Sequence, residues 1–254
     1  MRRLLFVIVM LLVVNALLPR PILSKDISVL MREGDALWVK RKDMEKARAS
    51  IDSYKKVLEV DAKSYEAYWK IARAYFYLGD LLPETKEMRD QHREMGLEGM
   101  QYAKKAIDIN PRGVEGHYYY TLTLGQYSIG ISIIRALAKG LGPKYEEHIE
   151  KALEIDRNYD NAGPLRAVGR YWYQVPWPKR DLKKSIYYLK EGVVSAPINV
   201  RGHVYLAESY LKAGEKELAR KYLQKALEIL PDLKQEVDAL RWKERAGEIL
   251  KGKF

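Results

Sequence analysis

The side chains in this sequence that are best suited to chemistry are aromatic rings and guanidinium groups, which bind ligands. Tyrosine occurs 19 times and tryptophan five times. An aromatic face attracts a cation, and an arginine fork pairs with a carboxylate through two parallel hydrogen bonds. A surface that combines them could hold a peptide or a small organic anion. The residues that we expect on such a surface are Trp69, Arg73, Tyr118, Leu122, Arg166, Arg170 and Tyr173.

Two of these arginines also have a purely structural interpretation. Arg166 and Arg170 lie one helical turn apart, and each could pair with a carboxylate on a neighbouring helix. Two arginines at this spacing rarely need the same partner. The spacing therefore favours recognition of a ligand, with structural ion pairs as the alternative.

Catalytic and metal-binding arrangements do not occur in the sequence. The four histidines form no H-E-x-x-H arrangement, and neither a G-x-S-x-G motif nor a phosphate-binding loop is present. The sequence has no cysteine, which excludes disulfides and thiolate metal sites. His117 and His203 occupy equivalent positions in two repeats, so we expect them to fill space between helices. We predict a non-enzymatic protein without metal or cofactor.

The elements that position the candidate residues are helix hairpins that recur along the chain. The clearest copy lies at 200–233, where the apolar and small residues follow a tetratricopeptide pattern. Its first helix and the end of that helix are marked by His203, Leu206, Ala207, Tyr210 and Gly214, and its second by Ala219, Leu223, Ala226 and Pro231. One such hairpin cannot bury its apolar stripe alone, so neighbouring hairpins must stack on it.

Four further copies repeat the steps of four, three and five residues in the second helix. They are Ser50, Tyr54, Val57 and Ala62; Gly99, Ala103, Ala106 and Pro111; Tyr145, Ile149, Ala152 and Arg157; and Ser185, Leu189, Gly192 and Pro197. We therefore predict an all-α, right-handed α-solenoid of five hairpins over residues 27–254, closed by a C-terminal helix. The first helices should line its concave face, and we expect the glycines at helix ends.

Three inserts lengthen the repeats, and the first two are the longer ones. The charged segment 81–97 should extend a helix into solvent after Pro83. The second insert, 127–141, is apolar and could form a subunit contact in a homo-oligomer or a lid. The alternative is a longer helix pair that packs on its own repeat. The apolar side chains concerned are Ile129, Ile131, Ile133, Ile134, Leu137 and Leu141.

The first 24 residues are not part of the solenoid. Arg2 and Arg3 precede an apolar run from Leu4 to Leu18, which is shorter than the roughly 20 residues of a spanning helix. This length favours a secretory signal over an uncleaved membrane anchor. We therefore expect an exported, periplasmic or extracytoplasmic protein that meets the membrane only through this segment.

The chain carries a formal net charge of +11. Its basic residues are interspersed with acidic ones, as in MEKARASIDSYKK, which is typical of a solvated helix surface. We therefore do not expect nucleic acid as a partner.

The stretch from Glu98 to Leu233 resembles the T component of tripartite ATP-independent periplasmic (TRAP) transporters, and the related regulator of microtubule dynamics group. The words that carry the resemblance are GLEGMQYAKKAIDINPRGVEGHYYY and an expanded third repeat, then GRYWY before a proline-rich loop. The transporter resemblance implies association with a periplasmic solute-binding protein, trimerisation and a hydrophobic channel for an apolar ligand. Members of that group are often lipoproteins, and this chain lacks the cysteine for lipidation.

Three functional interpretations follow. The first is a protein that mediates protein–protein interaction, as an accessory to TRAP-type solute uptake. The second is a carrier that holds a small organic or apolar ligand in its groove or channel. The third is a structural module of an envelope assembly.

Overall fold

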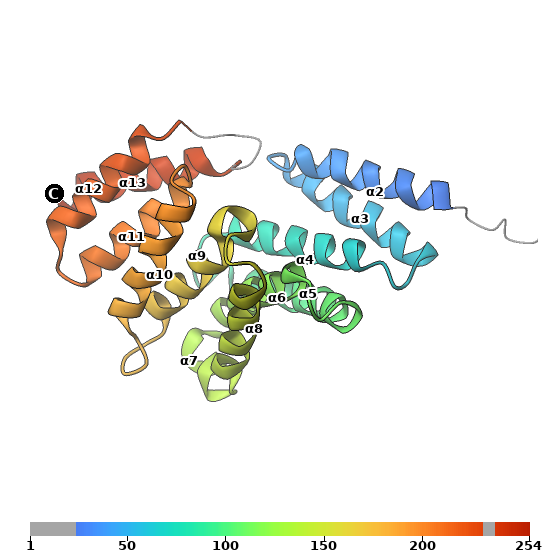
Figure 1. The fold of residues 1–254 in the computed structure, drawn as a ribbon, viewed down its shortest axis with the longest axis horizontal. Coiled ribbons are helices and arrows are strands. Elements are labelled where there is room, and N and C mark those ends of the chain that lie inside the picture. The colour runs from blue at the N-terminus through green and yellow to red at the C-terminus, as the bar shows by residue number, and fades with distance from the viewer. Residues whose placement is uncertain (1–23, 231–236) are drawn as a thin grey trace, which may run out of the picture.

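A computed structural model describes residues 24–230 and 237–254 of the chain. Within these two ranges the regular structure is entirely helical (Figure 1), and the expected solenoid of five hairpins with a terminal helix is confirmed. The helices are α2 (Ser24–Val39), α3 (Met44–Val60), α4 (Tyr65–Asp80), α5 (Arg89–Ile109), α6 (Val114–Ile131), α7 (Ile133–Ala138), α8 (Leu141–Asp156), α9 (Tyr159–Gln174), α10 (Leu182–Ser195), α11 (Val200–Lys212), α12 (Lys216–Glu228) and α13 (Ala239–Lys253).

The hairpins are α2–α3, α4–α5, α6–α8, α9–α10 and α11–α12, and α13 is the closing helix. Short polar side chains start several of these helices by accepting a hydrogen bond from an otherwise unpaired backbone N–H. Asp181 accepts from the N–H of Lys184 at 2.9 Å, and Asn199 accepts from Gly202 at 2.8 Å. Each cap sets the residue at which its helix begins, because the helix starts directly after it.

The repeated positions of the second helices form the seam between neighbouring helices. Ala103, Ala152 and Ala226 are completely buried, and so is Leu189. A methyl side chain lets two helix backbones approach closely, so the apolar stripes of successive hairpins join into one seam. His117 and His203 are 6% and 0% exposed, which confirms their expected packing role.

The first insert lengthens a helix after Pro83, since residues 89–97 begin α5, but the expectation that this extension lies wholly in solvent is wrong. Residues 81–88 form a non-helical connection, and the start of α5 packs against the end of α6. His92 is 1% exposed, and its Nδ1 lies 2.6 Å from the side-chain oxygen of Gln126. The many charged residues lower the mean hydropathy of the segment and so suggested that it is exposed. One face of the segment is nevertheless buried.

Glycines make this α5–α6 contact possible. A Cβ atom on Gly96 would collide with the backbone nitrogen of Tyr127, and one on Gly130 would lie 2.5 Å from the backbone nitrogen of Arg93. Only two described glycines, Gly140 and Gly214, have a positive φ. The expectation that glycines serve mainly as helix ends is therefore wrong, since several allow helices to approach closely instead.

The first turn of α9 is left-handed. Asp160, Asn161 and Ala162 have φ values of 51°, 53° and 61°. This conformation costs roughly 1–2 kcal/mol for each residue other than glycine. Arg166 offsets part of this cost, because its Nη1 donates to the carbonyl oxygens of Asp160, at 3.0 Å, and of Asn161.

An ion-pair cluster ties hairpins that are distant in sequence. Arg201 on α11 and Arg241 on α13 both donate to the carboxylate of Asp80 at the end of α4, at 2.7 and 2.6 Å. Both also pair with Asp238, at 2.7 and 3.4 Å. Burial raises the pKa of Asp80, but the two arginines outweigh it and hold that pKa below its ordinary value. The second hairpin is therefore joined to the fifth and to the closing helix.

Residues 1–23 and 231–236 lie outside the described residues. The expected signal or anchor over residues 1–24 and the helix-ending role of Pro231 therefore remain predictions. Among the helices from Ser24 onward, none combines the length and the apolar character needed to span a membrane.

Candidate binding groove

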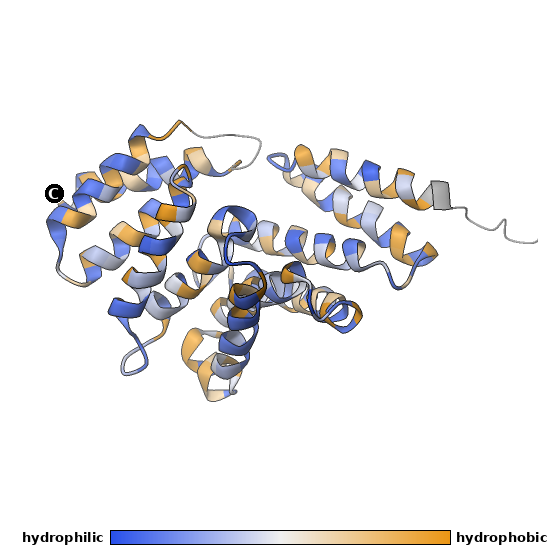
Figure 2. Cartoon of the chain, viewed as in Figure 1, coloured by the Kyte–Doolittle hydropathy of each residue, from blue (hydrophilic) through white to orange (hydrophobic). Residues whose placement is uncertain are grey.

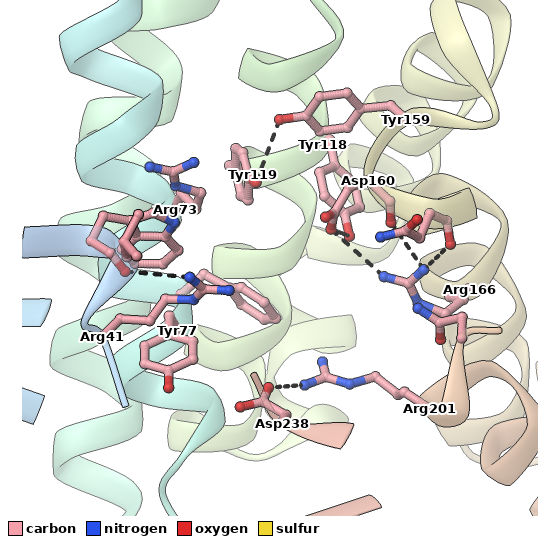
Figure 3. A pocket seen from close by; sticks show the side chains of 15 residues that line it. Arg41, Arg73, Tyr77, Tyr118, Tyr119, Tyr159, Asp160, Arg166, Arg201 and Asp238 are labelled. Carbon is pink, nitrogen blue, oxygen red and sulfur yellow. Dashed lines mark hydrogen bonds and ion pairs between the residues drawn. The ribbon is translucent and has the colours of Figure 1, made fainter. Parts of the chain in front are cut away.

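A cavity of about 400 Å³ opens on the inner side of the solenoid. The first helix of every hairpin contributes to it, as does the segment that leads into α13. It is lined by Trp38, Val39, Arg41, Arg73, Phe76, Tyr77, Tyr118, Tyr119, Tyr159, Asp160, Asn161, Arg166, Asn199, Arg201 and Asp238. We refer to this cavity as the groove. Its side chains surround an open centre (Figure 3).

One wall of the groove is a stack of rings and guanidinium groups from α2, α4 and the α2–α3 connection. The guanidinium carbon of Arg73 lies 4.1 Å from the centre of the Trp38 ring, and that of Arg41 lies 4.8 Å from it. Arg41 also lies 5.8 Å from the ring of Tyr77. Trp69 supports the wall from behind, at 4.9 Å from Arg73. Cation–π contacts thus hold both arginines in place.

The opposite wall is built on the left-handed turn of α9. The hydroxyl of Tyr118 donates to the carboxylate of Asp160 at 3.0 Å, and the hydroxyl of Tyr159 contacts that of Tyr119 at 3.5 Å. Burial, and then the charge of Asp160, raise the pKa of Tyr118 well above its ordinary value. Its hydroxyl therefore remains protonated and acts as a donor. Arg166 completes this wall, opposite Arg41 and Arg73 (Figure 3).

The lower edge of the groove is formed by Arg201 and Asp238, which face each other in Figure 3. Burial lowers the pKa of Arg201, but the neighbouring Asp80, followed by Tyr205 and Asp238, outweighs it and raises that pKa above its ordinary value. This edge is therefore already neutralised within the protein.

The structure places five of the seven expected concave-face residues on two adjoining cavities. Arg73 lines the groove, Tyr118 and Arg166 line both cavities, and Leu122 and Arg170 line the second cavity, which adjoins the groove. Trp69 lies behind the groove and stacks on Tyr119, with ring centres 6.0 Å apart. Tyr173 does not line either cavity and instead stacks on Arg170, at 4.7 Å from its guanidinium carbon. Whether these residues bind a ligand remains a prediction.

The structural interpretation of the two neighbouring arginines holds for Arg170. It pairs with Glu208 on α11 at 2.6 Å, and Arg245 from α13 pairs with the same carboxylate at 3.2 Å. Arg166 is also occupied, by the backbone of the left-handed turn and by Asp160 at 3.6 Å. Neither arginine therefore presents an unpaired charge to a ligand.

Several groove residues were not among those expected from the sequence. Trp38 and Arg41 belong to the poorest copy of the repeat, where the spacing rule has no clear starting point. Arg201 lies two residues before His203, and so precedes the core pattern from which groove positions were counted. Asp238 lies outside any repeat. A count of the charged residues that begin the first helices would have found Arg201, but no sequence signal joins it to Asp238.

The apolar insert surrounds a small cavity between α6, α7, α8 and α9. Ile129, Ile133, Leu137 and Leu141 line it together with Tyr145 and Tyr171, and its volume is about 70 Å³. Figure 2 shows that α7 is among the most hydrophobic helices of the chain. Ile131 is partly buried, and Ile134 is 72% exposed. The subunit contact and the lid remain predictions, and most of the insert packs on its own repeat.

In the part of the chain that the structure describes, no three His, Asp or Glu side chains are grouped as a metal site would require. The groove instead offers guanidinium donors, tyrosine hydroxyls and aromatic faces, which suit a peptide or an organic anion.

Comparison with known proteins identifies the family. A sequence model described as regulator of microtubule dynamics protein 1-3 matches residues 30–188, which is more than half of the chain. The chain belongs to this family. A second model, the tetratricopeptide repeat, matches residues 200–233, the segment in which the repeat pattern is clearest.

Among the relatives, regulator of microtubule dynamics protein 3 of Rattus norvegicus is 25% identical over 202 residues, which are 73% of this chain and 41% of the relative. Regulator of microtubule dynamics protein 1 of Bos taurus is 24% identical over 218 residues, 79% of this chain and 65% of the relative. The chain thus spans about two fifths of the rat protein and less than two thirds of the bovine one.

Solved structures confirm the tetratricopeptide fold. A tetratricopeptide protein of Thermus thermophilus superposes with a TM-score of 0.61 at 18% identity, over 85% of this chain and 98% of that one. PilW, a type IV pilus biogenesis factor, superposes with a TM-score of 0.55 at 18% identity, over 89% of this chain and 94% of that one. At this identity the likeness concerns the fold alone.

Proposed function

We propose that this chain is a non-enzymatic interaction protein that holds an extended segment of a partner protein in the groove. The observation that carries the proposal is the lining of the groove, in which the first helices of all five hairpins present aromatic and guanidinium side chains to one cavity. Solenoids of stacked repeats use such concave surfaces for recognition. Aromatic rings and arginines are also the residues that contribute most to protein interfaces.

Photo-crosslinking tests the proposal. Phe76 lines both the groove and the adjoining cavity, so p-benzoylphenylalanine at this position should crosslink to a bound partner. The matched control is the same replacement at Tyr187, which is 63% exposed and lies on α10, a second helix. We expect a discrete adduct from position 76 in cells that express the full chain, and none from position 187. Equal labelling at both positions, or no adduct at position 76, would overturn the proposal.

The cellular setting of this interaction is a further part of the proposal. The basic start and short apolar run of residues 1–24 support export, and the sequence resemblance to the T component of TRAP transporters supports a periplasmic solute-binding protein as the partner. A structural role in an envelope assembly is the alternative setting. N-terminal sequencing of the purified protein tests export, because a cleaved signal would leave a new N-terminus near residue 24.

A carrier for a small apolar ligand is the second candidate function. It is favoured by the apolar cavity beneath α7, which shares Gly125, Ile129 and Tyr145 with the cavity that adjoins the groove. Its volume of about 70 Å³ holds two or so water molecules at roughly 30 Å³ each. Ligand pockets are typically about 300–1,000 Å³, so α7 would have to move outward. Native mass spectrometry of freshly purified protein would show a bound small molecule if the chain is a carrier.

A further inference from the structure

The arginines around the groove fall into two groups. Arg166, Arg170 and Arg201 each pair with a carboxylate at 3.6, 2.6 and 2.7 Å. Arg41 and Arg73, by contrast, have no ion pair among residues 24–230 and 237–254. The Nη1 atom of Arg41 donates to the carbonyl oxygen of Trp38 at 3.3 Å, and Nη2 of Arg73 contacts the neutral hydroxyl of Tyr54 at 3.5 Å. The Nε atom of Arg73 is buried without a partner.

The guanidinium groups of Arg41 and Arg73 share one aromatic partner. Both contact the Trp38 ring, at 4.8 and 4.1 Å from its centre. Their central carbons are therefore at most 8.9 Å apart, the sum of these two distances. Burial lowers the pKa of Arg41, and Arg73 lowers it further, while Tyr77, Asp238 and Asp160 oppose the shift. Two positive charges thus lie against one ring, and neither has an ion-pair partner among the described residues.

We propose that Arg41 and Arg73 form a subsite for a carboxylate, and that the segment held in the groove is an acidic peptide. The inference rests on the proposed function, because it specifies the chemistry of the partner that occupies the groove. A carboxylate that approaches either guanidinium group accepts charge-assisted hydrogen bonds from it and is attracted by the charge of the other, and such bonds are about twice as strong as neutral ones.

The charge balance of the whole cavity supports an anionic occupant. Four guanidinium groups and two carboxylates line it, which leaves two positive charges. Both carboxylates are already engaged, Asp160 by Tyr118 and Arg166, and Asp238 by Arg201 and Arg241. The surplus charge therefore belongs to the wall that carries Arg41 and Arg73.

Other groups in the groove favour a peptide as the source of the carboxylate. The side-chain amides of Asn161 and Asn199 line the same cavity. The oxygen of Asn199 already accepts from Gly202, but an amide nitrogen can donate to the carbonyl oxygen of a peptide bond. Aromatic rings from α2, α4, α6 and α9 offer faces for apolar side chains between the acidic ones. An isolated inorganic anion would bind to the arginines but would not contact the amides and the aromatic faces.

Selection from a random peptide library tests the subsite even though the partner is unidentified. The full chain is immobilised and exposed to a phage-displayed library of dodecapeptides, and the selected sequences are compared with those from the variant R41Q/R73Q. We expect enrichment of Asp and Glu on the original chain and loss of this enrichment on the variant. The selected peptide should bind the variant at least tenfold more weakly in fluorescence anisotropy.

Arg48 provides the matched control, because it is an exposed arginine on α3 and R48Q removes the same charge away from the groove. R48Q should change the affinity of the selected peptide less than twofold. R73K keeps the charge but lacks the planar fork, so it should lose part of the affinity. Far-UV circular dichroism and thermal unfolding establish that each variant is folded.

Several results would overturn the subsite. They are a selected consensus without acidic residues, an equal loss of affinity in R48Q, or micromolar binding of inorganic phosphate that displaces the peptide. If position 76 crosslinks to a partner but R41Q/R73Q binds it normally, the groove retains its proposed function and only the subsite fails. If position 76 gives no adduct and the library gives no binders, both proposals fail.

Discussion

At the residue scale, the groove shows how surroundings decide the role of identical side chains. Arg170 and Arg73 are both stacked on aromatic rings, but Arg170 pairs with Glu208 at 2.6 Å, whereas the polar partner of Arg73 among the described residues is the hydroxyl of Tyr54. The first arginine holds α9 against α11. The second has no ion-pair partner in the part of the chain that the structure describes.

The histidine pair in the third hairpin makes a residue-scale prediction about pH. The Nε2 atom of His117 donates to the carbonyl oxygen of Pro111 at 3.0 Å, so its Nδ1 accepts from Nδ1 of His148, also at 3.0 Å. Burial, and then the charge of His117, lower the pKa of His148 from 6.5 to about 4. Between these values the unfolded chain binds a proton that the folded chain does not, so stability falls as the pH falls through this window.

The variant H148Q isolates this effect, because an amide can still donate to His117 but does not titrate. Each pKa unit is worth about 1.4 kcal/mol, so the free energy of unfolding of the original chain should drop by about 2 kcal/mol more than that of H148Q between pH 7 and pH 4.5. Urea unfolding at both pH values measures the difference. Parallel losses in the two proteins would show that His148 is not kept neutral by the fold.

At the element scale, close helix contacts rather than exposed extensions accommodate the first insert. Among the described helices α5 is the longest, and it lies against α6. Gly96 and Gly130 have no side chain, so the two backbones can touch there. Tight packing of this kind leaves no space for an added methyl group.

The variant G96A tests this contact. Its new Cβ would collide with the backbone of Tyr127, which cannot move aside as a flexible side chain can, and overpacking typically costs about 1–3 kcal/mol. The matched control is G247A in α13, where a Cβ would meet nothing within 4 Å. We expect G247A to be neutral or stabilising by up to about 1 kcal/mol, because alanine favours helix more than glycine does. Thermal unfolding compares the two, and equal melting temperatures would contradict the contact.

At the scale of the whole molecule, the Asp80 cluster closes the solenoid on itself. Stacked repeats normally contact only their neighbours, yet Asp80 pairs with Arg201 and Arg241, which are 121 and 161 residues away. The same cluster supplies the lower edge of the groove through Arg201 and Asp238. The curvature of the groove and the docking of α13 are therefore coupled.

The variant D80N should loosen this closure. Loss of one partner from a buried ion cluster costs about 3–5 kcal/mol because it leaves a charge uncompensated. The side chain of Asp80 is 15% exposed, which points to the lower end of that range. Hydrogen–deuterium exchange should increase in α13 and α11 and remain unchanged in α3. The control D90N alters a carboxylate that is 85% exposed, and unchanged exchange in D80N relative to D90N would contradict the coupling.

The sequence by itself determined the hairpins and their number. The steps of four, three and five residues place small side chains such as Ala103, Ala152 and Ala226 on one helix face. Because of the period of the α-helix, this spacing directly predicts a buried stripe. The repeat pattern is local, and positions counted from its start include five residues, of the seven expected, that lie on or beside the groove.

Only the tertiary structure decided which charges meet. Asp80, Arg201 and Asp238 come together because small rotations between successive hairpins accumulate over the whole solenoid, and no local spacing encodes that sum. The same accumulation brings the left-handed turn at Asp160 opposite Arg41. The unpaired arginines could therefore be distinguished from the paired ones only after every hairpin was in place.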